Sequence, residues 1–175
     1  MIETHIIGIG DVLIEEERSE ASARREKWDL RFLKLARVVA SWSKDPSTKV
    51  GAVLVETPQN NIVSTGYNGF PRDMPDENLH DREHKYACTV HAEMNALLNM
   101  AFRARHKGEL TLYVTPLPPC ERCAVHLLQA GVKRVVVGLD AGNAETREQW
   151  MERGRTSAWY LQRAGVKITY YNGGE

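Results

Sequence analysis

Cysteine is scarce in this sequence, with three residues in a chain of 175. Cys120 and Cys123 belong to one short motif, so Cys88 has no obvious partner and a disulfide framework is excluded. Reduced thiols are typical of the cytosol, where disulfides are rare. We therefore expect a cytoplasmic protein in which the paired cysteines serve a chemical purpose other than cross-linking the chain.

The sequence also lacks an excess of charge and any long apolar run. Lys and Arg number 23 and Asp and Glu number 23, so bulk attraction to a polyanion is not expected. The first residues lack the basic region and long apolar stretch of a signal peptide, and no segment approaches the length of a membrane span. We expect neither a membrane nor a nucleic-acid partner, while a local basic pocket for one phosphate remains compatible with this charge balance.

What the sequence does contain is typical of a single globular domain. Hydrophobic residues make up 42% and charged residues 26% of the chain. Residues 1–13 are apolar with interrupting glycines, which fits an edge strand, a subunit-contact arm or a poorly ordered segment. Residues 15–27 are dense in charge, which fits a solvated helix face or a linker. We therefore divide the chain into an N-terminal extension at 1–27 and a main domain at 28–175.

Hydrophobic periodicity predicts alternating helices and strands in the main domain. The predicted helices are 28–42, 91–106, 120–130, 146–153 and 157–164, and the predicted strands are 50–56, 62–66, 110–114, 132–137 and 166–171. The polar segment 73–89 is predicted to be a long loop, and loops of that length are often functional. This order predicts an α/β fold, a three-layer α/β/α sandwich with a mixed central sheet of about five strands.

Two short segments carry the residues best suited to chemistry, residues 91–93 (HAE) and residues 119–123 (PCERC). Thiolate sulfur and imidazole nitrogen are preferred ligands of zinc, and three protein ligands leave one position open for water, which marks a catalytic site. Both segments lie where a predicted helix begins, and a helix N-terminus lowers the pKa of a cysteine. H-x-E followed by P-C-x-x-C is the signature of zinc deaminases. A redox C-x-x-C motif and a closed zinc knuckle are the alternatives, and the upstream His-x-Glu argues against both.

Glu93 is the carboxylate that this zinc site does not need as a ligand. A zinc ion activates water near neutral pH. Glu93 can take a proton from that water and deliver it to a ring nitrogen and then to departing ammonia. A carboxylate in the first turn also stabilises the helix dipole, so a structural role is the alternative. The H-x-E spacing favours the catalytic role.

Three further motifs make the chain resemble the cytidine and deoxycytidylate deaminase superfamily, and within it the deoxycytidylate (dCMP) deaminases. They are residues 43–52 (SKDPSTKVGA), residues 66–72 (GYNGFPR) and Lys85-Tyr86 shortly before the His-x-Glu. The resemblance covers roughly residues 28–171. It implies a cytidine deaminase-like fold for a zinc-dependent deaminase domain. The implied reaction converts dCMP and water to dUMP and ammonia, which supplies thymidylate synthesis.

The resemblance also implies roles for individual residues. Asn68 matches the family asparagine that contacts the sugar of the substrate, and the loops at 43–49 and 68–72 would hold the 5′-phosphate. An arginine is well suited to that anion because it binds phosphate bidentately. The implied site consists of zinc ligands at His91, Cys120 and Cys123, a proton shuttle at Glu93, phosphate contacts at Arg72, Lys44 and Ser43, and backbone contacts to the base near Ala92 and Thr115.

Regulation and assembly are further expectations from the resemblance. Many family members respond to dCTP and dTTP at a nucleotide site on an oligomer, often a hexamer. We therefore expect a homo-oligomer with one catalytic zinc ion per subunit, and Mg²⁺ accompanying a nucleotide effector. The chain departs from the family pattern at Asp73, where members commonly carry Gly after the Pro-Arg pair. A carboxylate there would alter the loop, or repel a phosphate if it faced the pocket.

A second, structural zinc site is one alternative within the family. His80, His84 and Cys88 lie at four-residue steps, so on a helix they would face the same way. A fourth ligand is not evident, and Arg82 and Lys85 add positive charge. We therefore expect surface histidines and a buried free cysteine.

Alternatives to dCMP deamination also remain. One is a deaminase acting on another base, such as tRNA adenosine, free cytosine, a riboflavin-pathway pyrimidine or a modified dCMP. The zero net charge and the long segment at 73–89 argue against tRNA, which favours a basic face. The other is a non-catalytic zinc-binding module, for which Glu93 would have no catalytic use.

Overall fold

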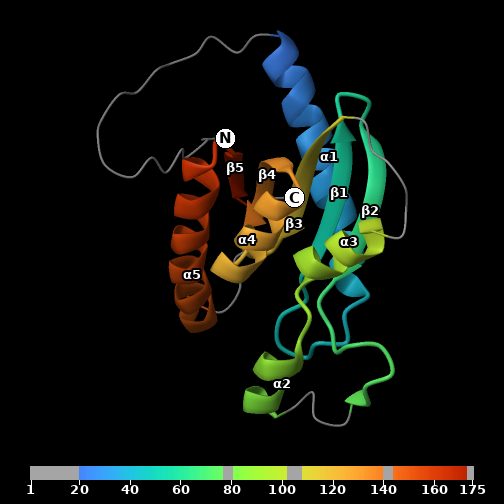
Figure 1. Cartoon of the computed structure of the whole chain (residues 1–175), viewed down its shortest axis with the longest axis vertical. Coiled ribbons are helices and arrows are strands. Elements are labelled where there is room, and N and C mark those ends of the chain that lie inside the picture. The colour runs from blue at the N-terminus through green and yellow to red at the C-terminus, as the bar shows by residue number, and fades with distance from the viewer. Residues whose placement is uncertain (1–19, 77–80, 102–107, 140–143, 173–175) are drawn as a thin grey trace.

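A mixed sheet of five strands forms the centre of the computed structural model, which describes residues 20–76, 81–101, 108–139 and 144–172 (Figure 1). The strands lie in the order β2-β1-β3-β4-β5. β1 pairs antiparallel with β2 and β3, whereas β3, β4 and β5 run parallel to one another. The strands are β1 (Gly51–Thr57), β2 (Asn61–Tyr67), β3 (Glu109–Thr115), β4 (Val132–Leu139) and β5 (Lys167–Asn172).

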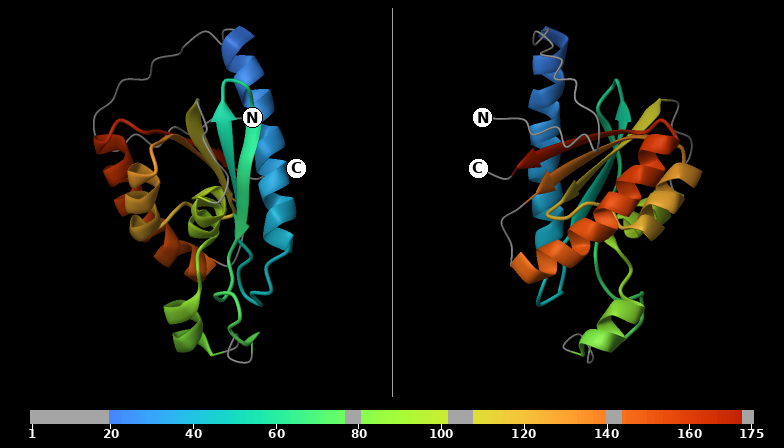
Figure 2. Two further views of the ribbon diagram at one scale, coloured as in Figure 1. Left: turned by 45° about the vertical axis from the view of Figure 1, so that its right-hand side comes forward. Right: turned by 90° about the vertical axis from the view of Figure 1, so that its left-hand side faces the viewer.

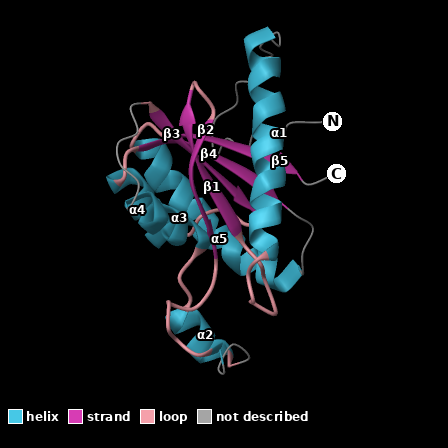
Figure 3. Cartoon of the chain, turned by 90° about the vertical axis from the view of Figure 1, so that its right-hand side faces the viewer, coloured by secondary structure: helices cyan, strands magenta, loops and turns pink. Residues whose placement is uncertain are grey.

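Helices cover both faces of this sheet, as Figures 2 and 3 show. α1 lies alone on one face, and α3, α4 and α5 lie on the other. α2 stands apart from the sheet, at the end where the loops before β1 and after β2 lie. The helices are α1 (Glu20–Ser41), α2 (Arg82–Cys88), α3 (Ala92–Ala101), α4 (Glu121–Gln129) and α5 (Ala144–Arg163). The predicted three-layer α/β/α sandwich with a mixed sheet of about five strands is confirmed.

Each face of the sheet has its own buried core because side chains alternate between the faces along each strand. On the α1 side, Phe32, Ala36 and Val39 pack against Val53 and Tyr113. The larger cluster lies under α3, α4 and α5. Its buried members are Ala52, Leu54, Ala92, Ala96, Leu97, Leu110, Leu112, Val114, Ala124, Leu127, Val132, Val135, Val137, Leu139, Leu161 and Val166. In the described ranges, no helix is both long and apolar enough to cross a membrane.

One of the predictions about helices was confirmed in a longer form, and one prediction of a loop was wrong. The segments 146–153 and 157–164 are helical as predicted, and they belong to one continuous helix, α5, that includes Gly154. A Cβ on Gly154 would lie 2.4 Å from Cγ of Pro118, so the glycine allows α5 to pack against the loop before α4. Part of the predicted loop at 73–89 is helix α2, whose N-cap Asp81 accepts hydrogen bonds from the amides of Glu83 and His84.

The predicted division at residue 27 falls inside α1, which runs without interruption from Glu20 to Ser41. Residues 15–27 are dense in charge, and the helical part of this segment continues into the turns that pack on the sheet. Residues 1–19 lie outside the described residues, so the expectations for 1–13 fall there as well. The N-terminal extension at 1–27 stays a prediction.

A buried ionic network ties α1 to the sheet. The carboxylate of Asp29, which is fully buried, accepts hydrogen bonds of 2.7 and 2.6 Å from the guanidinium of Arg134 on β4. It also accepts from the hydroxyl groups of Tyr113 on β3, at 2.9 Å, and Tyr171 on β5, at 3.0 Å. The network satisfies a carboxylate at the centre of the α1 interface, and so it fixes how α1 crosses three strands.

Gly66 positions α3 by allowing the helix backbone to touch β2. A Cβ at Gly66 would lie 2.3 Å from the carbonyl oxygen of Ala92 and 2.3 Å from the amide nitrogen of Ala96. Side chains on both elements reinforce this contact, because the hydroxyl of Ser64 donates to the carbonyl of Ala96 at 2.7 Å and the amide of Asn99 donates to the carbonyl of Thr65 at 2.8 Å. The start of α3 is therefore fixed against β2.

Replacement of Gly66 by Ala is expected to lower the free energy of unfolding by about 1–3 kcal/mol or more, because α3 must move away from β2. The matched control is Gly69→Ala, since a Cβ at Gly69 would meet nothing within 4 Å. Urea unfolding of both variants measures the loss. Equal stability of the two variants would contradict the close packing of α3 on β2.

Candidate active site

Three side chains with metal-binding atoms meet where α3 and α4 begin. The ligand atoms of His91, Cys120 and Cys123 all lie within 4.8 Å of one another. His91 Nδ1 is 3.5 Å from Sγ of Cys120 and 3.4 Å from Sγ of Cys123. Nitrogen and sulfur ligands of a tetrahedral zinc ion lie about 3.6 Å apart, by its usual bond lengths. The donor set and its spacing therefore fit zinc.

Local sequence places these three side chains on short, well-ordered turns. His91 directly precedes α3, and its carbonyl accepts the amide of Asn95 at 3.0 Å, as the N-cap of a helix does. Cys120 is the N-cap of α4, and Cys123 follows in the first turn. Both helix N-termini direct their partial positive charge toward the same point, which favours thiolate sulfur there.

The two cysteines have opposite pKa shifts because they are hydrogen-bonded to each other. A hydrogen bond from the Cys123 thiol, together with one from His91, lowers the pKa of Cys120 to about 4. The hydrogen bond to Cys120, together with burial, raises the pKa of Cys123. The hydrogen bond to Cys120 also raises the pKa of His91. A metal ion that binds both sulfurs as thiolates must displace the proton of the Cys123 thiol, so metal binding is expected to release protons.

Glu93 lies beside this cluster in the first turn of α3, with 3% of its surface exposed. Burial raises the pKa of its carboxyl group above the usual range. A buried carboxyl with a raised pKa, next to metal-binding side chains and facing a cavity, is suited to accept and return a proton near neutral pH.

A cavity of about 560 Å³ opens beside these residues, lined by residues of α2, the starts of α3 and α4, and α5. Its size is that of a small-molecule site. Of the residues predicted for the site, His91, Glu93, Cys120, Cys123, Asn68 and Ala92 line it. The other lining residues are Asp45, Ser47, Thr48, Val50, Lys85, Tyr86, Ala87, Thr89, Val90, Met94, Leu117, Pro118, Arg122, His126, Trp150 and Arg153.

Asn68 holds one wall of the cavity together. Its side-chain oxygen accepts the amide of Val50 at 2.8 Å, and its side-chain nitrogen donates to the carbonyl of Thr48 at 2.9 Å and to Asp45 at 3.4 Å. Its backbone carbonyl accepts the hydroxyl of Ser43 at 2.8 Å. The amide of Asn68 is therefore engaged by the loop between α1 and β1, and its contact with a sugar stays a prediction.

Four predicted substrate contacts lie outside the cavity lining. Ser43 is buried, and its hydroxyl group donates a hydrogen bond to the backbone carbonyl of Asn68. Lys44 forms an ion pair with Asp76 on the surface. Arg72 donates to the side-chain oxygen of Asn99 at 3.3 Å. Thr115 is buried at the end of β3. Their contacts with a substrate stay predictions. Other cationic side chains, Lys85, Arg122 and Arg153, do line the cavity.

Lys85 lines the cavity, although the sequence analysis assigned it no function. Its ammonium group is 3.1 Å from Asp45 Oδ1 and donates to the hydroxyl of Ser47 at 2.8 Å, with its side chain only 6% exposed. Lys85 had marked only a resemblance in the sequence. The buried ion pair joins α2 to the loop between α1 and β1, and so fixes α2 over the cavity.

Trp150 and Arg153 on α5 also line the cavity, and no signal in the sequence pointed to them. The ring of Trp150 lies edge-on to His91, 5.8 Å between centroids, and edge-on to Tyr86 of α2 at 6.3 Å. Arg153 stacks over Trp150 and forms a bidentate ion pair with Glu121 at 2.8 Å. These contacts bring α5 close to the metal-binding cluster.

The possible second zinc site receives no support from the described residues. His84 lies edge-on to Phe70, and Cys88 is a free, half-buried cysteine rather than a fully buried one. His80 lies outside the described residues. Within the described part of the chain, His91, Cys120 and Cys123 are the one group of side chains arranged to hold a metal ion.

Comparison with known proteins agrees with this geometry. The sequence model of the cytidine and deoxycytidylate deaminase zinc-binding region matches residues 26–139. The chain belongs to this family. The match includes the metal-binding cluster, Glu93 and four of the five strands, and it ends before α5. Family membership therefore accounts for the zinc-binding region, whereas the cavity wall made by α5 is outside the matched part.

Curated relatives are 32% to 46% identical to this chain over the aligned residues. It is 40% identical over 145 residues to an uncharacterized deaminase in the luxG 3′ region of Aliivibrio fischeri, covering 82% of this chain and 93% of that protein. It is 41% identical over 119 residues to the deoxycytidylate deaminase of Mus musculus, covering 63% of this chain and 64% of the mouse protein. The chain thus spans less than two thirds of the mouse protein.

A solved structure of similar fold is the dCMP deaminase of cyanophage S-TIM5 in complex with dCMP and dUMP. The TM-score is 0.65 at 24% sequence identity, and the alignment covers 83% of this chain and 97% of the phage protein. At that identity the similarity establishes the fold and leaves the substrate to other arguments.

Proposed function

We propose that this protein deaminates dCMP hydrolytically to dUMP and ammonia, with zinc as cofactor. The observation that carries the proposal is the buried Glu93 beside His91, Cys120 and Cys123 in the lining of a cavity of about 560 Å³. Relatives named deoxycytidylate deaminase, at 36% and 41% identity, support the choice of substrate.

His91 Nδ1 and the sulfur atoms of Cys120 and Cys123 would hold one zinc ion per subunit. A bound zinc ion supplies Lewis acidity that activates water near neutral pH. Glu93 would accept a proton on its carboxylate and pass it to the ring nitrogen, and a second proton to the leaving amine. The oxygen of water becomes the carbonyl oxygen of the product, the carbon–nitrogen bond breaks, and ammonia leaves.

The rest of the chain would orient the base and exclude water from the buried part of the cavity. Ala92 is fully buried in the cavity lining, and its small side chain leaves room for a flat ring beside Glu93. Trp150 limits the cavity on the α5 side. Asn68 keeps the opposite wall in place through its bonds to Thr48 and Val50.

The proposal includes finer features that follow from the family resemblance. They are assembly as a homo-oligomer, with a hexamer favoured, regulation by dCTP and dTTP, Mg²⁺ bound together with such an effector, a role in thymidylate supply and a cytoplasmic location. Sedimentation of the zinc-loaded protein with and without dCTP tests the first two together.

Ammonia release from zinc-loaded protein tests the proposed function. We expect turnover of dCMP well above that of deoxycytidine and CMP, loss of turnover on zinc chelation and recovery when zinc is restored. Parallel reactions with dCTP and dTTP, and with 5-methyl-dCMP, report on regulation and on modified bases. Turnover of another base with none of dCMP would move the assignment to a different deaminase, and zinc binding without any turnover would indicate a non-catalytic module.

A further inference from the structure

Some residues that line the cavity are buried and others are exposed, and this difference has consequences for a charged substrate. Glu93, Cys120 and Cys123 are each no more than 3% exposed. Tyr86, Arg122 and His126 also line the cavity, and these three residues are exposed. Burying a phosphate group without a compensating charge is energetically unfavourable. A nucleotide would therefore place its base beside the buried Glu93 and its phosphate beside the exposed lining residues.

Three cations line the cavity among the described residues, and two of them are already paired. Lys85 is held by Asp45 and Ser47 inside the wall. The guanidinium of Arg153 uses two of its nitrogens on the carboxylate of Glu121. A group held in a buried or bidentate ion pair must give up that pair before it can bind another anion.

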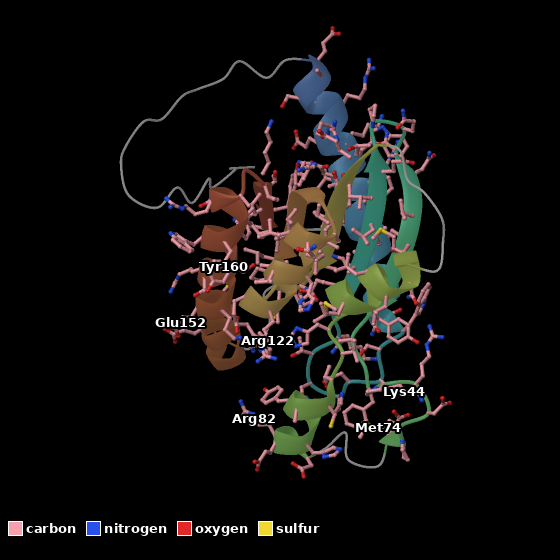
Figure 4. All side chains as sticks on the ribbon, viewed as in Figure 1. Lys44, Met74, Arg82, Arg122, Glu152 and Tyr160 are labelled. Atoms are coloured by element: carbon pink, nitrogen blue, oxygen red, sulfur yellow. The ribbon has the colours of Figure 1, made fainter. Side chains whose placement is uncertain are left out.

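Arg122 is the cation that remains. No hydrogen bond or ion pair of its guanidinium is present within the described residues, although the side chain lines the cavity. Its backbone is fixed, because Nδ1 of His126 lies 2.7 Å from the carbonyl oxygen of Arg122, which can only accept a hydrogen bond. Figure 4 shows Arg122 near the lower end of α5, on the side of α2.

We propose that Arg122 binds the 5′-phosphate of the substrate and so makes the enzyme prefer a nucleoside monophosphate to a nucleoside. Its guanidinium offers a planar fork of donors that matches two phosphate oxygens. Because Arg122 lies between the zinc-binding Cys120 and Cys123 in sequence, the same turn of α4 would set the distance between the reacting end and the anionic end of the substrate. The inference rests on the proposed function.

The cations predicted from sequence are less suited to this role. The side chain of Lys44 is 75% exposed, is paired with Asp76 and does not line the cavity. Arg72 likewise lies outside the lining and donates to Asn99. Arg122 lines the cavity and has no such ion pair or hydrogen bond to give up within the described residues, which favours it over both.

The test compares Arg122→Ala, Arg122→Lys and the control Arg155→Ala, an exposed arginine of α5 outside the lining. Loss of a charge-assisted contact is expected to lower kcat/KM for dCMP about 10- to 150-fold in Arg122→Ala, with a partial recovery in Arg122→Lys. The effect on deoxycytidine should be small, so the preference for dCMP over deoxycytidine falls. Arg155→Ala should keep the wild-type preference.

A second measurement separates this inference from the proposed function. Calorimetry measures the affinity of each zinc-loaded variant for dUMP and for deoxyuridine, which differ only in the phosphate. If Arg122→Ala weakens dUMP but not deoxyuridine, the phosphate contact holds even when wild-type protein fails to deaminate dCMP. If both ligands and both substrates weaken equally, or if neither changes, Arg122 does not bind phosphate and the inference is overturned. Zinc content, measured for each variant, shows whether a uniform loss comes from the metal-binding turn.

Discussion

Replacement of Glu93 by Gln is expected to lower kcat for dCMP about 10²- to 10⁴-fold, because the amide keeps the shape of the side chain but cannot accept and return a proton. The zinc content should stay at the wild-type level, since His91, Cys120 and Cys123 supply the metal-binding atoms. Stopped assays of ammonia release, with zinc measured on the same samples, give both quantities.

Stability should not fall with this substitution. Glu93 is almost fully buried, and burial raises the pKa of its carboxyl group. Ionisation of this carboxyl group therefore lowers the stability of the folded protein. A neutral amide removes that penalty, so the melting temperature of Glu93→Gln should equal or exceed that of wild type. A catalytic residue that costs stability is expected at an active site, where function and stability compete.

The control is Glu152→Gln, an exposed carboxylate of α5 that points away from the cavity (Figure 4). It should leave kcat, zinc content and stability unchanged. Wild-type turnover by Glu93→Gln would refute the proton shuttle. Loss of zinc together with loss of stability would instead assign Glu93 the structural role of a helix-terminal carboxylate.

The sequence predicted the parts of the site that lie close together in the chain. His91 and Glu93 fall in one turn, as do Cys120 and Cys123, so spacing alone was informative about each pair. The layers of the fold were equally accessible, because the valine-rich strand at 132–137 and the apolar face of α1 carry the periodicity of their elements. Local patterns therefore sufficed for the metal-binding half of the cavity.

The other half of the cavity depends on tertiary contacts that leave no local pattern. Trp150 and Arg153 belong to α5, and the contact of Gly154 with Pro118 shows how that helix packs against the loop before α4. Arg122 stood between two cysteines in the motif, yet its importance emerges only when Lys85 and Arg153 are found already paired. Only the positions of all three side chains show which of them has no ion pair within the described part of the chain.

Replacement of Asp29 by Ala is expected to lower the free energy of unfolding by about 3–5 kcal/mol, because it leaves the guanidinium of Arg134 without its counter-ion. Arg134 is 17% exposed and makes two hydrogen bonds to Asp29, so water can compensate only in part. The hydroxyl groups of Tyr113 and Tyr171 lose their acceptor as well. Urea unfolding of zinc-saturated protein measures the loss.

A double variant shows whether the cost arises from the stranded charge or from lost packing. Asp29→Ala combined with Arg134→Met removes both charges and should be more stable than Asp29→Ala alone, since an apolar pair can replace a buried ion pair at little cost. Activity at low temperature should survive in every variant that remains folded, because Asp29 lies on the α1 face of the sheet and the cavity on the other. Equal stability of the single and double variants would show that the buried charge of Arg134 costs nothing, and a selective loss of kcat in a stable variant would show that the two faces of the sheet are coupled.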